Sequence, residues 1–391
     1  MTRILYLVHD LDDPATERRA SMLQTGGADV DLVGFRRGTS PLARKAKVLG
    51  RTYNGKFLQR GWSALRVIGQ ARQLARDHQP DAILVRSFEM LPLARRIQAV
   101  SPRHRTPRII YEVLDVHHLM LGRGVVSATL RSIERRLCRK VDRVLVSSMR
   151  FNAEYLRRYD QIGEPPLLVE NKVWNAGAVN SPPRGAAAPR SDPDSITIGW
   201  FGILRCAASL RCLDALCRHG DGRIKLILRG RPALDSIPDF HQTVQNNPHM
   251  AFYGAYSYPD DLPRIYGEVD IAWLIDRMDA GANSDWLLPN RLYESCAHGV
   301  VPLALAQTET GHYLQRAGIG LQLPALDVAS VIDLLSRVDD RALAGLRAQV
   351  TAKRPSTWRV TQGDCERLVD VLAGRQHAAP VIPLRKAELA G

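Results

Sequence analysis

The segment from Leu287 to Ala304, LLPNRLYESCAHGVVPLA, carries a charged pair whose spacing suits nucleotide chemistry. Arg291 and Glu294 lie at the start of an expected helix, with Pro289 in its first turn and Asn290 as its cap. A surface helix with an ordinary ion pair between these two side chains is the alternative. The exposed N–H groups of a helix start and an arginine favour a diphosphate, and a carboxylate one turn further accepts hydrogen bonds from ribose hydroxyls. The pattern therefore predicts a nucleotide-sugar site.

Polar residues in the first half of the chain could take the proton that a sugar transfer releases. Asp115 follows the expected strand in YEVLDVH, Glu112 lies on that strand, and His117 comes just after it. A carboxylate accepts the proton of an acceptor hydroxyl, and a neighbouring histidine can tune or replace it. Asp115 is the favoured base, and the alternative is a charged strand end paired with an arginine. His9 and Asp10 follow the first strand and are expected to contact the acceptor.

Further residues of the second half are expected to surround the nucleotide sugar. Gly202 ends the strand ITIGWFG, at the sheet edge where open α/β folds bind ligands. Tyr253, Gly254 and Tyr256 follow a strand and would hold the base. The open alternatives are a core aromatic for Tyr256, a surface arginine for Arg205, and a turn or capping role for Asn283 and Ser284 in DAGANSDW. The predicted donor residues are Gly202, Arg205, Arg229, Tyr253, Gly254, Tyr256, Asn283, Ser284, Asn290, Arg291, Leu292 and Glu294.

Alternating strand and helix patterns predict two α/β domains in this chain of 391 residues. Thr2–Val8 and residues 28–35 form the opening βαβ unit, but no GxGxxG dinucleotide motif follows the first strand. The predicted divisions are a Rossmann-like domain at 1–174, which binds acceptor and membrane, a linker at 175–195, a second Rossmann-like domain at 196–356, a helix at 357–375 and a poorly ordered tail at 376–391.

The net charge of +14 is concentrated in one region. From Leu32 to Arg76 there is no acidic residue, and aromatic and aliphatic residues alternate with cations. Such a segment suits an anionic membrane surface, where each cation contributes ~1 kcal/mol. A second cluster, RSIERRLCRKVDR, extends the basic surface. A solvated basic face is the alternative, and without a recognition fold or stacking motif no nucleic-acid partner is expected. The cations are Arg36, Arg37, Arg44, Lys45, Lys47, Arg51, Lys56, Arg60, Arg66, Arg72 and Arg76.

Several other kinds of protein are not expected from this sequence. The N-terminal apolar run is too short for a signal peptide, and no segment has the apolar length of a membrane span. Six scattered cysteines form no CxxC pair, which favours reduced thiols in the cytoplasm over metal ligands. They are Cys138, Cys206, Cys212, Cys217, Cys296 and Cys365.

With these residues assembled, the chain resembles the GT-B glycosyltransferases of bacterial exopolysaccharide assembly. It is most similar to the succinoglycan-type glucosyltransferases, and more distantly to family 4 enzymes. The resemblance implies two Rossmann-like domains that face each other across a cleft, with the C-terminal helix crossing back to the first. It rests on YEVLDVH, GWFGILRC, LRGRP, FYGAY, PDDLPRIYGEVDIAW, GANSDWLLPNRLYE and GVVPLALAQTETG.

The resemblance also implies how the sugar is transferred. Retaining family 4 enzymes usually carry a second glutamate eight positions before the one matched by Glu294, where this chain has Trp286. This departure favours inversion. No DxD motif stands out, and such enzymes generally work without a metal, so arginines and helix dipoles would stabilise the leaving diphosphate.

The predicted function is transfer of a hexose, most simply glucose from UDP-glucose, to a polyprenyl-diphosphate-linked saccharide. The enzyme would need no cofactor beyond its UDP-sugar donor, and would be cytoplasmic and peripheral on the inner face of the plasma membrane. A GT-B sugar-nucleotide epimerase and a non-catalytic basic binding protein of the same fold are the alternatives.

Overall fold

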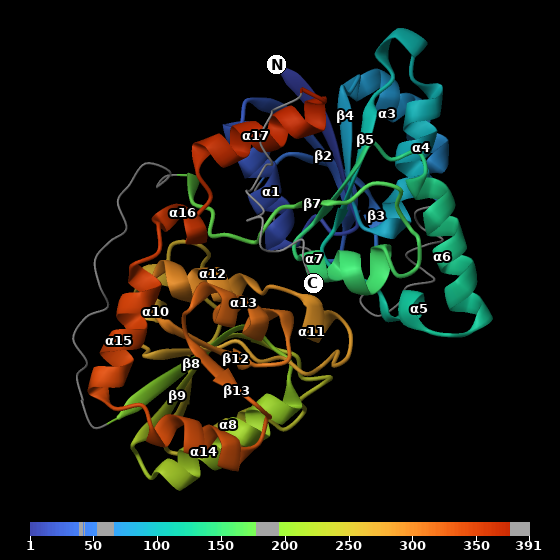
Figure 1. The fold of residues 1–391 in the computed structure, drawn as a ribbon. Helices are drawn as coiled ribbons and strands as arrows, with labels where there is room; N and C mark the ends of the chain where they lie inside the picture. Colours follow the sequence, from blue (N-terminus) through green and yellow to red (C-terminus); the bar gives the residue numbers. More distant parts are fainter. Residues whose placement is uncertain (39–41, 43, 53–65, 177–194, 376–391) are drawn as a thin grey trace. The chain divides into compact units, whose positions relative to one another are not determined.

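The structure is a computed structural model that describes residues 1–38, 42, 44–52, 66–176 and 195–375. The chain forms two compact units, coloured along the sequence in Figure 1. Unit 1 comprises Met1–Glu170 and Thr361–Gly391, and unit 2 comprises Asn171–Val360. Most of the expected linker and the whole expected tail lie outside the described residues.

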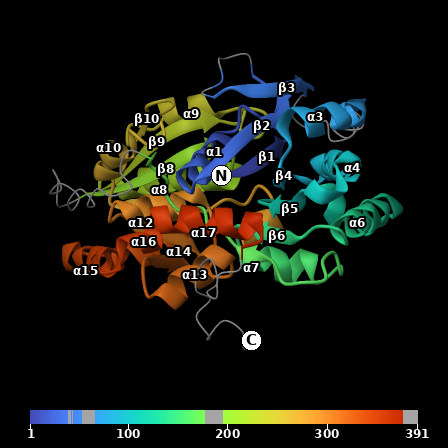
Figure 2. The ribbon, with the colours of Figure 1, turned by 90° about the horizontal axis from the view of Figure 1, so that it is seen from above.

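Unit 1 contains a seven-stranded sheet of parallel strands in the order β3-β2-β1-β4-β5-β6-β7. Helices α1 and α17 cover one face of this sheet, and α3, α4 and α6 lie on the other side (Figure 2). The strands are β1 Thr2–Val8, β2 Ala28–Arg36, β3 Ala46–Arg51, β4 Ala82–Arg86, β5 Arg108–Val113, β6 Arg143–Val146 and β7 Leu167–Leu168. The helices are α1 Pro14–Thr25, α3 Ala71–His78, α4 Leu91–Val100, α5 His118–Leu121, α6 Val125–Cys138, α7 Met149–Phe151 and α17 Gln362–Ala373.

Unit 2 contains a six-stranded parallel sheet in the order β10-β9-β8-β11-β12-β13. Its strands are β8 Ile196–Leu204, β9 Ile224–Pro232, β10 Met250–Phe252, β11 Ile271–Trp273, β12 Val301–Leu305 and β13 Leu321–Leu323. Its helices are α8 Ala207–Gly220, α9 Phe240–Gln245, α10 Leu262–Gly267, α11 Asn283–Trp286, α12 Asn290–Ala297, α13 Glu309–Ala317, α14 Val328–Ser336, α15 Asp340–Thr351 and α16 Pro355–Trp358.

Strand periodicity explains why unit 2 has two cores. Successive side chains of a strand point to opposite faces of the sheet. Trp200 of β8 therefore packs in one cluster and Phe201 in another, and Trp273 and Ala272 of β11 divide in the same way. Because helices cover both faces, the strands place apolar side chains on each face of the sheet, as in other parallel sheets. These two doubly covered sheets confirm the predicted α/β class.

The boundary between the units lies earlier than the expected position at residue 174. The N–H of Val173 donates to the carbonyl of Trp358 at 2.8 Å, and the N–H of Trp174 donates to the Tyr258 hydroxyl at 2.9 Å. Both partners belong to unit 2. These hydrogen bonds make residues 171–174 part of the second unit, so the predicted end of the first domain is wrong by this short segment.

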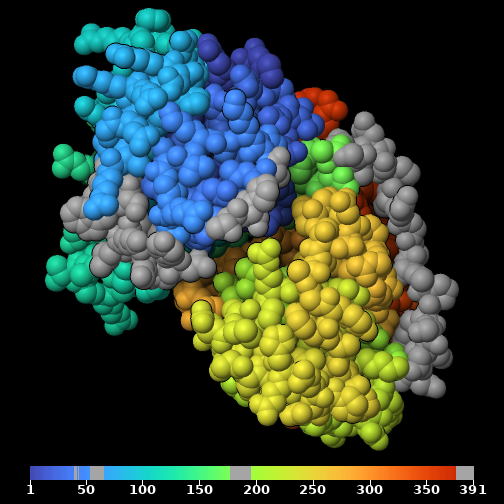
Figure 3. Space-filling model, turned by 180° about the vertical axis from the view of Figure 1, so that it is seen from behind, coloured from blue at the N-terminus to red at the C-terminus, as the bar shows by residue number. Residues whose placement is uncertain are grey.

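The basic segment between β2 and α3 contains a strand that was not expected. β3 pairs in parallel with β2 at the edge of the sheet, and both contribute to the blue surface of unit 1 in Figure 3. An edge strand with exposed cations resists pairing with another chain, which fits the position of Arg51. Other residues of the segment, Lys56 and Arg60 among them, lie outside the described residues.

The C-terminal helix returns to unit 1, as expected, but the predicted single helix at 357–375 is two helices. An extended stretch separates α16 from α17, and Thr361 begins α17 with a capping box that includes Asp364. α17 contacts α1, β4 and β5. The approach to α1 is close, because a Cβ atom added at Gly26 would lie 2.3 Å from the Cys365 carbonyl oxygen.

No helix among the described residues is both long and apolar enough to cross a membrane. All six cysteines are buried and none forms a disulfide.

The close contact between α1 and α17 predicts that adding a single methyl group at Gly26 destabilises the protein. Gly26→Ala should lower the free energy of unfolding by about 1–3 kcal/mol, because the added Cβ meets backbone that has to shift. Gly345→Ala is the matched control, since a Cβ in the middle of α15 meets nothing within 4 Å. The control should gain up to about 1 kcal/mol of helix propensity. Urea unfolding followed by circular dichroism measures both, and equal stability of the two variants would contradict the packing argument.

Candidate functional site

A buried carboxylate organises the carboxyl ends of the strands in unit 1. Glu112 at the end of β5 is 1% exposed, and its two oxygens lie 2.7 Å from Arg19 Nε and 2.9 Å from Arg86 Nε. The Tyr6 hydroxyl donates to it at 3.0 Å. Burial alone would raise the pKa of Glu112, but the two guanidinium groups outweigh it and lower the pKa to about 2. Glu112 is therefore a permanently ionised structural group.

This geometry corrects the proposal of Glu112 as a catalytic base. A carboxylate with a pKa of about 2 is a weak base, and its oxygens already accept hydrogen bonds from Arg19, Arg86 and Tyr6. The sequence shows the acid at the strand end, but it does not show that two distant arginines converge on it.

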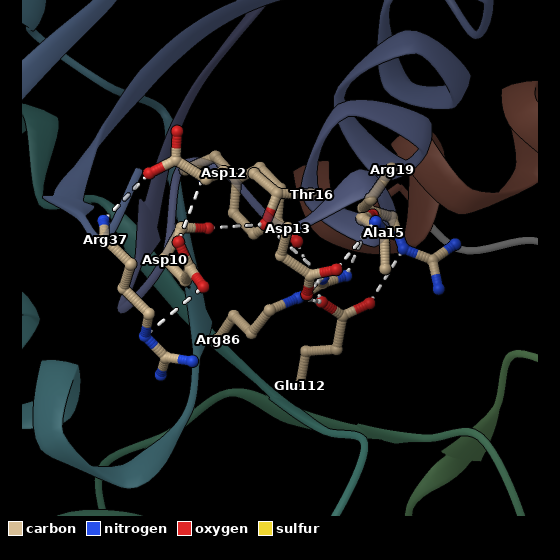
Figure 4. Close-up of polar contacts among 10 residues, drawn as sticks. Asp10, Asp12, Asp13, Ala15, Thr16, Arg19, Arg37, Arg86 and Glu112 are labelled. Atoms are coloured by element: carbon tan, nitrogen blue, oxygen red, sulfur yellow. Dashed lines mark hydrogen bonds and ion pairs between the residues drawn. The ribbon is translucent and has the colours of Figure 1, made fainter. Parts of the chain in front are cut away.

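The loop after β1 is fixed by three aspartates, one of which, Asp12, accepts from the N–H of Arg37 at 2.8 Å (Figure 4). Asp13 caps α1 by accepting from the N–H of Ala15 at 2.9 Å, and it also lies 3.3 Å from Arg86. Asp10, one of the predicted acceptor residues, is 8% exposed and lies 3.3 Å from Arg37. Burial raises the pKa of Asp10, and the charge of Arg37 opposes this shift. The loop therefore presents a defined set of charges beside the Glu112 network.

A cavity of about 310 Å³ lies beside this loop, entirely within unit 1. Residues that follow β1, β4 and β5 line it, at the sheet edge where open α/β folds bind ligands. It brings together four of the residues predicted for catalysis and acceptor binding: His9, Glu112, Asp115 and His117. Asp115 is exposed, whereas Nδ1 of His117 accepts from the N–H of Leu119 at 3.3 Å and caps α5.

Glu134 of α6 also lines this cavity and was not expected from the sequence. It is 2% exposed and accepts hydrogen bonds from the hydroxyls of Tyr111 at 3.0 Å and Tyr155 at 2.5 Å. Burial raises the pKa of Glu134 to about 7, although the two tyrosine hydrogen bonds lower it. Such a carboxyl can hold or release a proton near neutral pH. Its sequence context, RSIERRLCRK, resembles a solvated basic helix, and the only signal is that it is the one acid there.

Ser87, another cavity residue, has an unusual backbone. It follows β4 with φ 75° and ψ 150°, a region that residues other than glycine rarely adopt. Its hydroxyl is buried and has no hydrogen-bond partner among the described residues. Strain and an unpartnered polar group at one position are typical of a ligand-binding loop.

Three glycines form the corresponding sheet edge of unit 2. Gly202 of β8 pairs with Gly230 of β9, and the N–H of Gly230 donates to the carbonyl of Gly254 at 2.7 Å. A Cβ atom at Gly230 would lie 1.9 Å from the Gly202 oxygen, so no larger residue fits. The three have φ values of +101°, +128° and +74°.

The predicted pair on α12 lies at this edge. Arg291 donates to the carbonyl of Phe201 at 3.4 Å, directly before Gly202. Glu294 is 4% exposed and accepts from the Tyr266 hydroxyl at 3.1 Å. The ring of Phe201 meets those of Tyr266 and Tyr256 edge-on, with centroid separations of 5.1 and 6.4 Å. The structure therefore brings Gly202, Tyr256, Arg291 and Glu294 together at this edge.

Two other predicted donor arginines are held by acids. Arg205 lies 2.7 Å from Asp276. Arg229 lies 2.6 Å from Glu268, and its guanidinium stacks over Tyr253 with 4.5 Å to the ring centre. Among the described residues, no carboxylate forms an ion pair with Arg291. It is therefore the cation of this group best able to bind an anion.

Three of the four remaining donor candidates, Asn283, Ser284 and Leu292, have local roles in the structure. Asn283 donates to Asp279 at 2.7 Å, and Ser284 accepts from the Asp279 N–H at 3.0 Å, as the turn alternative anticipates. Asn290 is not the cap of α12, because Pro289 has the extended backbone of that position. Leu292 is wrong as a ligand: its side chain is fully buried in the core, and its N–H donates to the carbonyl of Pro289.

Comparison with known proteins gives the family. Residues 14–169 match a glycosyl transferase 4-like domain. Over 388 residues the chain is 43% identical to succinoglycan biosynthesis protein ExoL of Rhizobium meliloti (strain 1021), an alignment that covers 97% of this chain and 95% of ExoL. The chain belongs to the ExoL family of GT-B glycosyltransferases. Membership in the ExoL family confirms that it is an enzyme, as predicted.

Solved structures share the fold of this ExoL relative. HepE of Anabaena, in complex with UDP and glucose, aligns with a TM-score of 0.66 and 13% identity over 96% of this chain and 100% of HepE. Sucrose-phosphate synthase from Thermosynechococcus elongatus aligns with a TM-score of 0.70 and 13% identity, over 96% and 99% of the two chains. At such identities the similarity shows the fold alone, and it confirms the predicted GT-B architecture.

The raised pKa of Glu134 predicts how the stability of the protein depends on pH. The folded state keeps a proton up to about pH 7, whereas the unfolded chain releases it near 4.5. The free energy of unfolding should therefore fall as the pH rises between these values and level off above them. The side chain in Glu134→Gln stays neutral at every pH. Between about pH 5 and about pH 8 the free energy of unfolding of this variant should therefore fall by up to about 3 kcal/mol less than that of the wild type.

Unfolding followed by circular dichroism across this pH range tests the prediction. Glu366→Gln, which changes an exposed carboxyl on α17, should keep the wild-type profile. A Glu134→Gln profile parallel to that of the wild type would mean that Glu134 is ionised throughout.

Proposed function

We propose that this glycosyltransferase moves glucose from UDP-glucose to a lipid-linked oligosaccharide during assembly of a succinoglycan-type exopolysaccharide. Two comparisons support the pathway and the donor. The relative ExoL is a succinoglycan biosynthesis protein, and HepE, which has the same fold, forms complexes with UDP and glucose.

The observation that carries this proposal is the placement of Arg291 and Glu294 beside Gly202. Glu294 would accept hydrogen bonds from the ribose hydroxyls, and Arg291 would bind the diphosphate. The open backbone at Gly202 lets a phosphate or sugar approach closely, because a Cβ there would have no neighbour within 4 Å. Tyr256 would form an aromatic wall beside the nucleotide.

The proposed reaction inverts the anomeric carbon in one displacement. An acceptor hydroxyl oxygen forms its bond to the anomeric carbon while the bond from that carbon to the phosphate oxygen breaks. The leaving UDP takes the bonding electrons, and Arg291 stabilises its growing charge. Asp115, exposed at the rim of the unit 1 cavity, takes the hydroxyl proton, and His117 is the second candidate. Trp286, which stands where retaining relatives carry a glutamate, is buried and has no group for a retaining step.

The acceptor would occupy the cavity of unit 1, which His9 lines, and Asp10, the next residue in the chain, would contact it from outside that lining. Its polyprenyl diphosphate would stay in the lipid, so we propose that the enzyme is cytoplasmic and peripheral on the inner face of the plasma membrane. A net charge of +14 favours such an anionic surface.

The nucleotide site predicts a specific loss of UDP affinity. Glu294→Ala should weaken UDP binding by about 1.5–3 kcal/mol, because the ribose hydroxyls lose a charged acceptor. Glu294→Gln keeps an acceptor for Tyr266 and should show an intermediate loss on a stably folded protein. Arg291→Ala should reduce turnover more than UDP affinity, since its charge matters most as the diphosphate leaves. Glu309→Ala is the control, because that acid is paired with Arg316 on α13 and should not alter binding.

Calorimetric titration with UDP measures these effects. Wild-type affinity in both Glu294 variants would mean that the ribose does not bind there.

The proposed charge stabilisation also predicts that no divalent metal is needed. Among the described residues there is no group of three histidines, cysteines or acids arranged to hold a metal ion. Transfer from labelled UDP-glucose into the lipid fraction of isolated membranes should therefore survive EDTA. If EDTA abolished transfer and magnesium or manganese restored it, Arg291 could not be the main stabilising group.

A further inference from the structure

The outward face of α6 combines exposed apolar side chains with cations. Val125 is 82% exposed, Val126 61% and Ile133 44%, which is unusual for large apolar residues on one short helix. Arg136 lies about three turns after Val125 on the same stripe, and the exposed Lys140 follows just beyond the end of the helix at Cys138. Residues around α5 and α6, in green-teal, project at the edge of unit 1 in Figure 3.

No acid lies on this face. Glu134 is the single acid of α6, and it is buried on the opposite side, in the cavity. Asp142, the next acid along the chain, is paired with Arg108 and accepts from the N–H of Ile109. Among the described residues, no carboxylate forms an ion pair with Arg136 or Lys140.

The cations of the acid-free segment 32–76 differ from those of the α6 face in their ion pairing. Several of them are paired with acids elsewhere in unit 1, which neutralises part of the charge that the sequence shows there. The pairs are Arg36–Asp12, Arg37–Asp10, Arg44–Glu17 and Lys47–Asp77. The described part of that segment is therefore a poorer anion-binding surface than its sequence predicts, whereas the α6 face keeps its positive charge.

We propose that the outward face of α6 is the surface by which unit 1 docks on an anionic lipid bilayer. Exposed valines at one end of a helix and unpaired cations at the other have the chemistry of the lipid interface, with acyl chains for the former and phosphate headgroups for the latter. The inference deepens the proposed function, since it places the acceptor cavity close to the lipid. The inner face of the same helix lines that cavity through Glu134, so about one helix diameter of ~10 Å separates the cavity from the bilayer.

Sedimentation with vesicles tests this surface. Vesicles of phosphatidylglycerol and phosphatidylethanolamine should bind the full chain, and phosphatidylcholine vesicles should not. Arg139, the exposed residue that caps α6, lies between Arg136 and Lys140 in the chain. Reversing Arg136, Arg139 and Lys140 together to glutamate should weaken binding to the anionic vesicles roughly tenfold. Val125→Ser with Val126→Ser should also weaken binding, but with little dependence on salt, because burial of apolar area is not screened.

A matched control changes the same charge elsewhere in unit 1. Lys45, Arg72 and Arg76 are exposed cations of the acid-free segment, and their joint reversal to glutamate should leave most of the binding. Release by this control but not by the α6 variants would overturn the assignment. The assignment would also be overturned if the valine variant still bound vesicles but no longer formed a dimer that the wild type forms. In that case α6 would contact a second copy of the chain.

UDP titration of the same variants separates this inference from the proposed function. Variants that no longer bind vesicles but keep the wild-type affinity for UDP support the α6 surface. A wild-type chain that binds UDP but no anionic vesicle refutes the surface and leaves the donor site standing. A chain that binds anionic vesicles through α6 but does not bind UDP refutes the donor site and leaves the α6 surface standing.

Discussion

The ionised carboxylate of Glu112, held by two arginines in the interior of unit 1, is the interaction on which the rest of that unit depends. It connects β5 to α1 through Arg19 and to β4 through Arg86, and Tyr6 adds β1. Burying these charges is costly, and removal of one partner from such a pair typically costs 3–5 kcal/mol because the other is left uncompensated. Apolar residues could fill the space, but they would not fix the directions of the strand ends. Arg86 also reaches Asp13, so the same network positions the loop that borders the cavity.

Two of the buried carboxyls that line the cavity, Glu112 and Glu134, have pKa values shifted in opposite directions by their surroundings. Arginines hold the pKa of Glu112 at about 2, whereas burial raises the pKa of Glu134 to about 7, because no cation among the described residues pairs with it. When two environments shift the pKa values of two acids apart in this way, one acid is a permanent charge and the other exchanges protons near neutral pH. The permanent charge orders the protein around the cavity. The exchangeable proton belongs to the cavity that the exposed Asp115 also lines, and we propose Asp115 as the base of the reaction.

The fold was predictable from the sequence to the extent that it depends on local pattern. Strand β1 was predicted with the bounds that the structure has, because an apolar run between turn residues is a local signal. The Arg291–Glu294 pair was recognisable for the same reason, as both residues lie on one helix. β3 was missed because an edge strand needs no continuous apolar pattern. Glu112 was misjudged and Glu134 missed because their roles depend on residues far along the chain, such as Arg19 and Tyr155, whose approach no spacing reveals.

Formal charge is a poor guide to where this protein binds anions. The acid-free stretch at 32–76 is the most basic part of the sequence, yet four of its cations, Arg36, Arg37, Arg44 and Lys47, are paired with acids that lie elsewhere in unit 1. In unit 2, Arg205 and Arg229 are likewise neutralised by Asp276 and Glu268. An arginine that already has a carboxylate gains little from a phosphate, because the new contact must first displace the old one. The informative cations are those that the fold leaves without an acid. Among the described residues these include Arg291 at the glycine edge of β8 and Arg136 on the outward face of α6. The two proposals, a diphosphate at the first and a lipid surface at the second, therefore rest on the same physical argument.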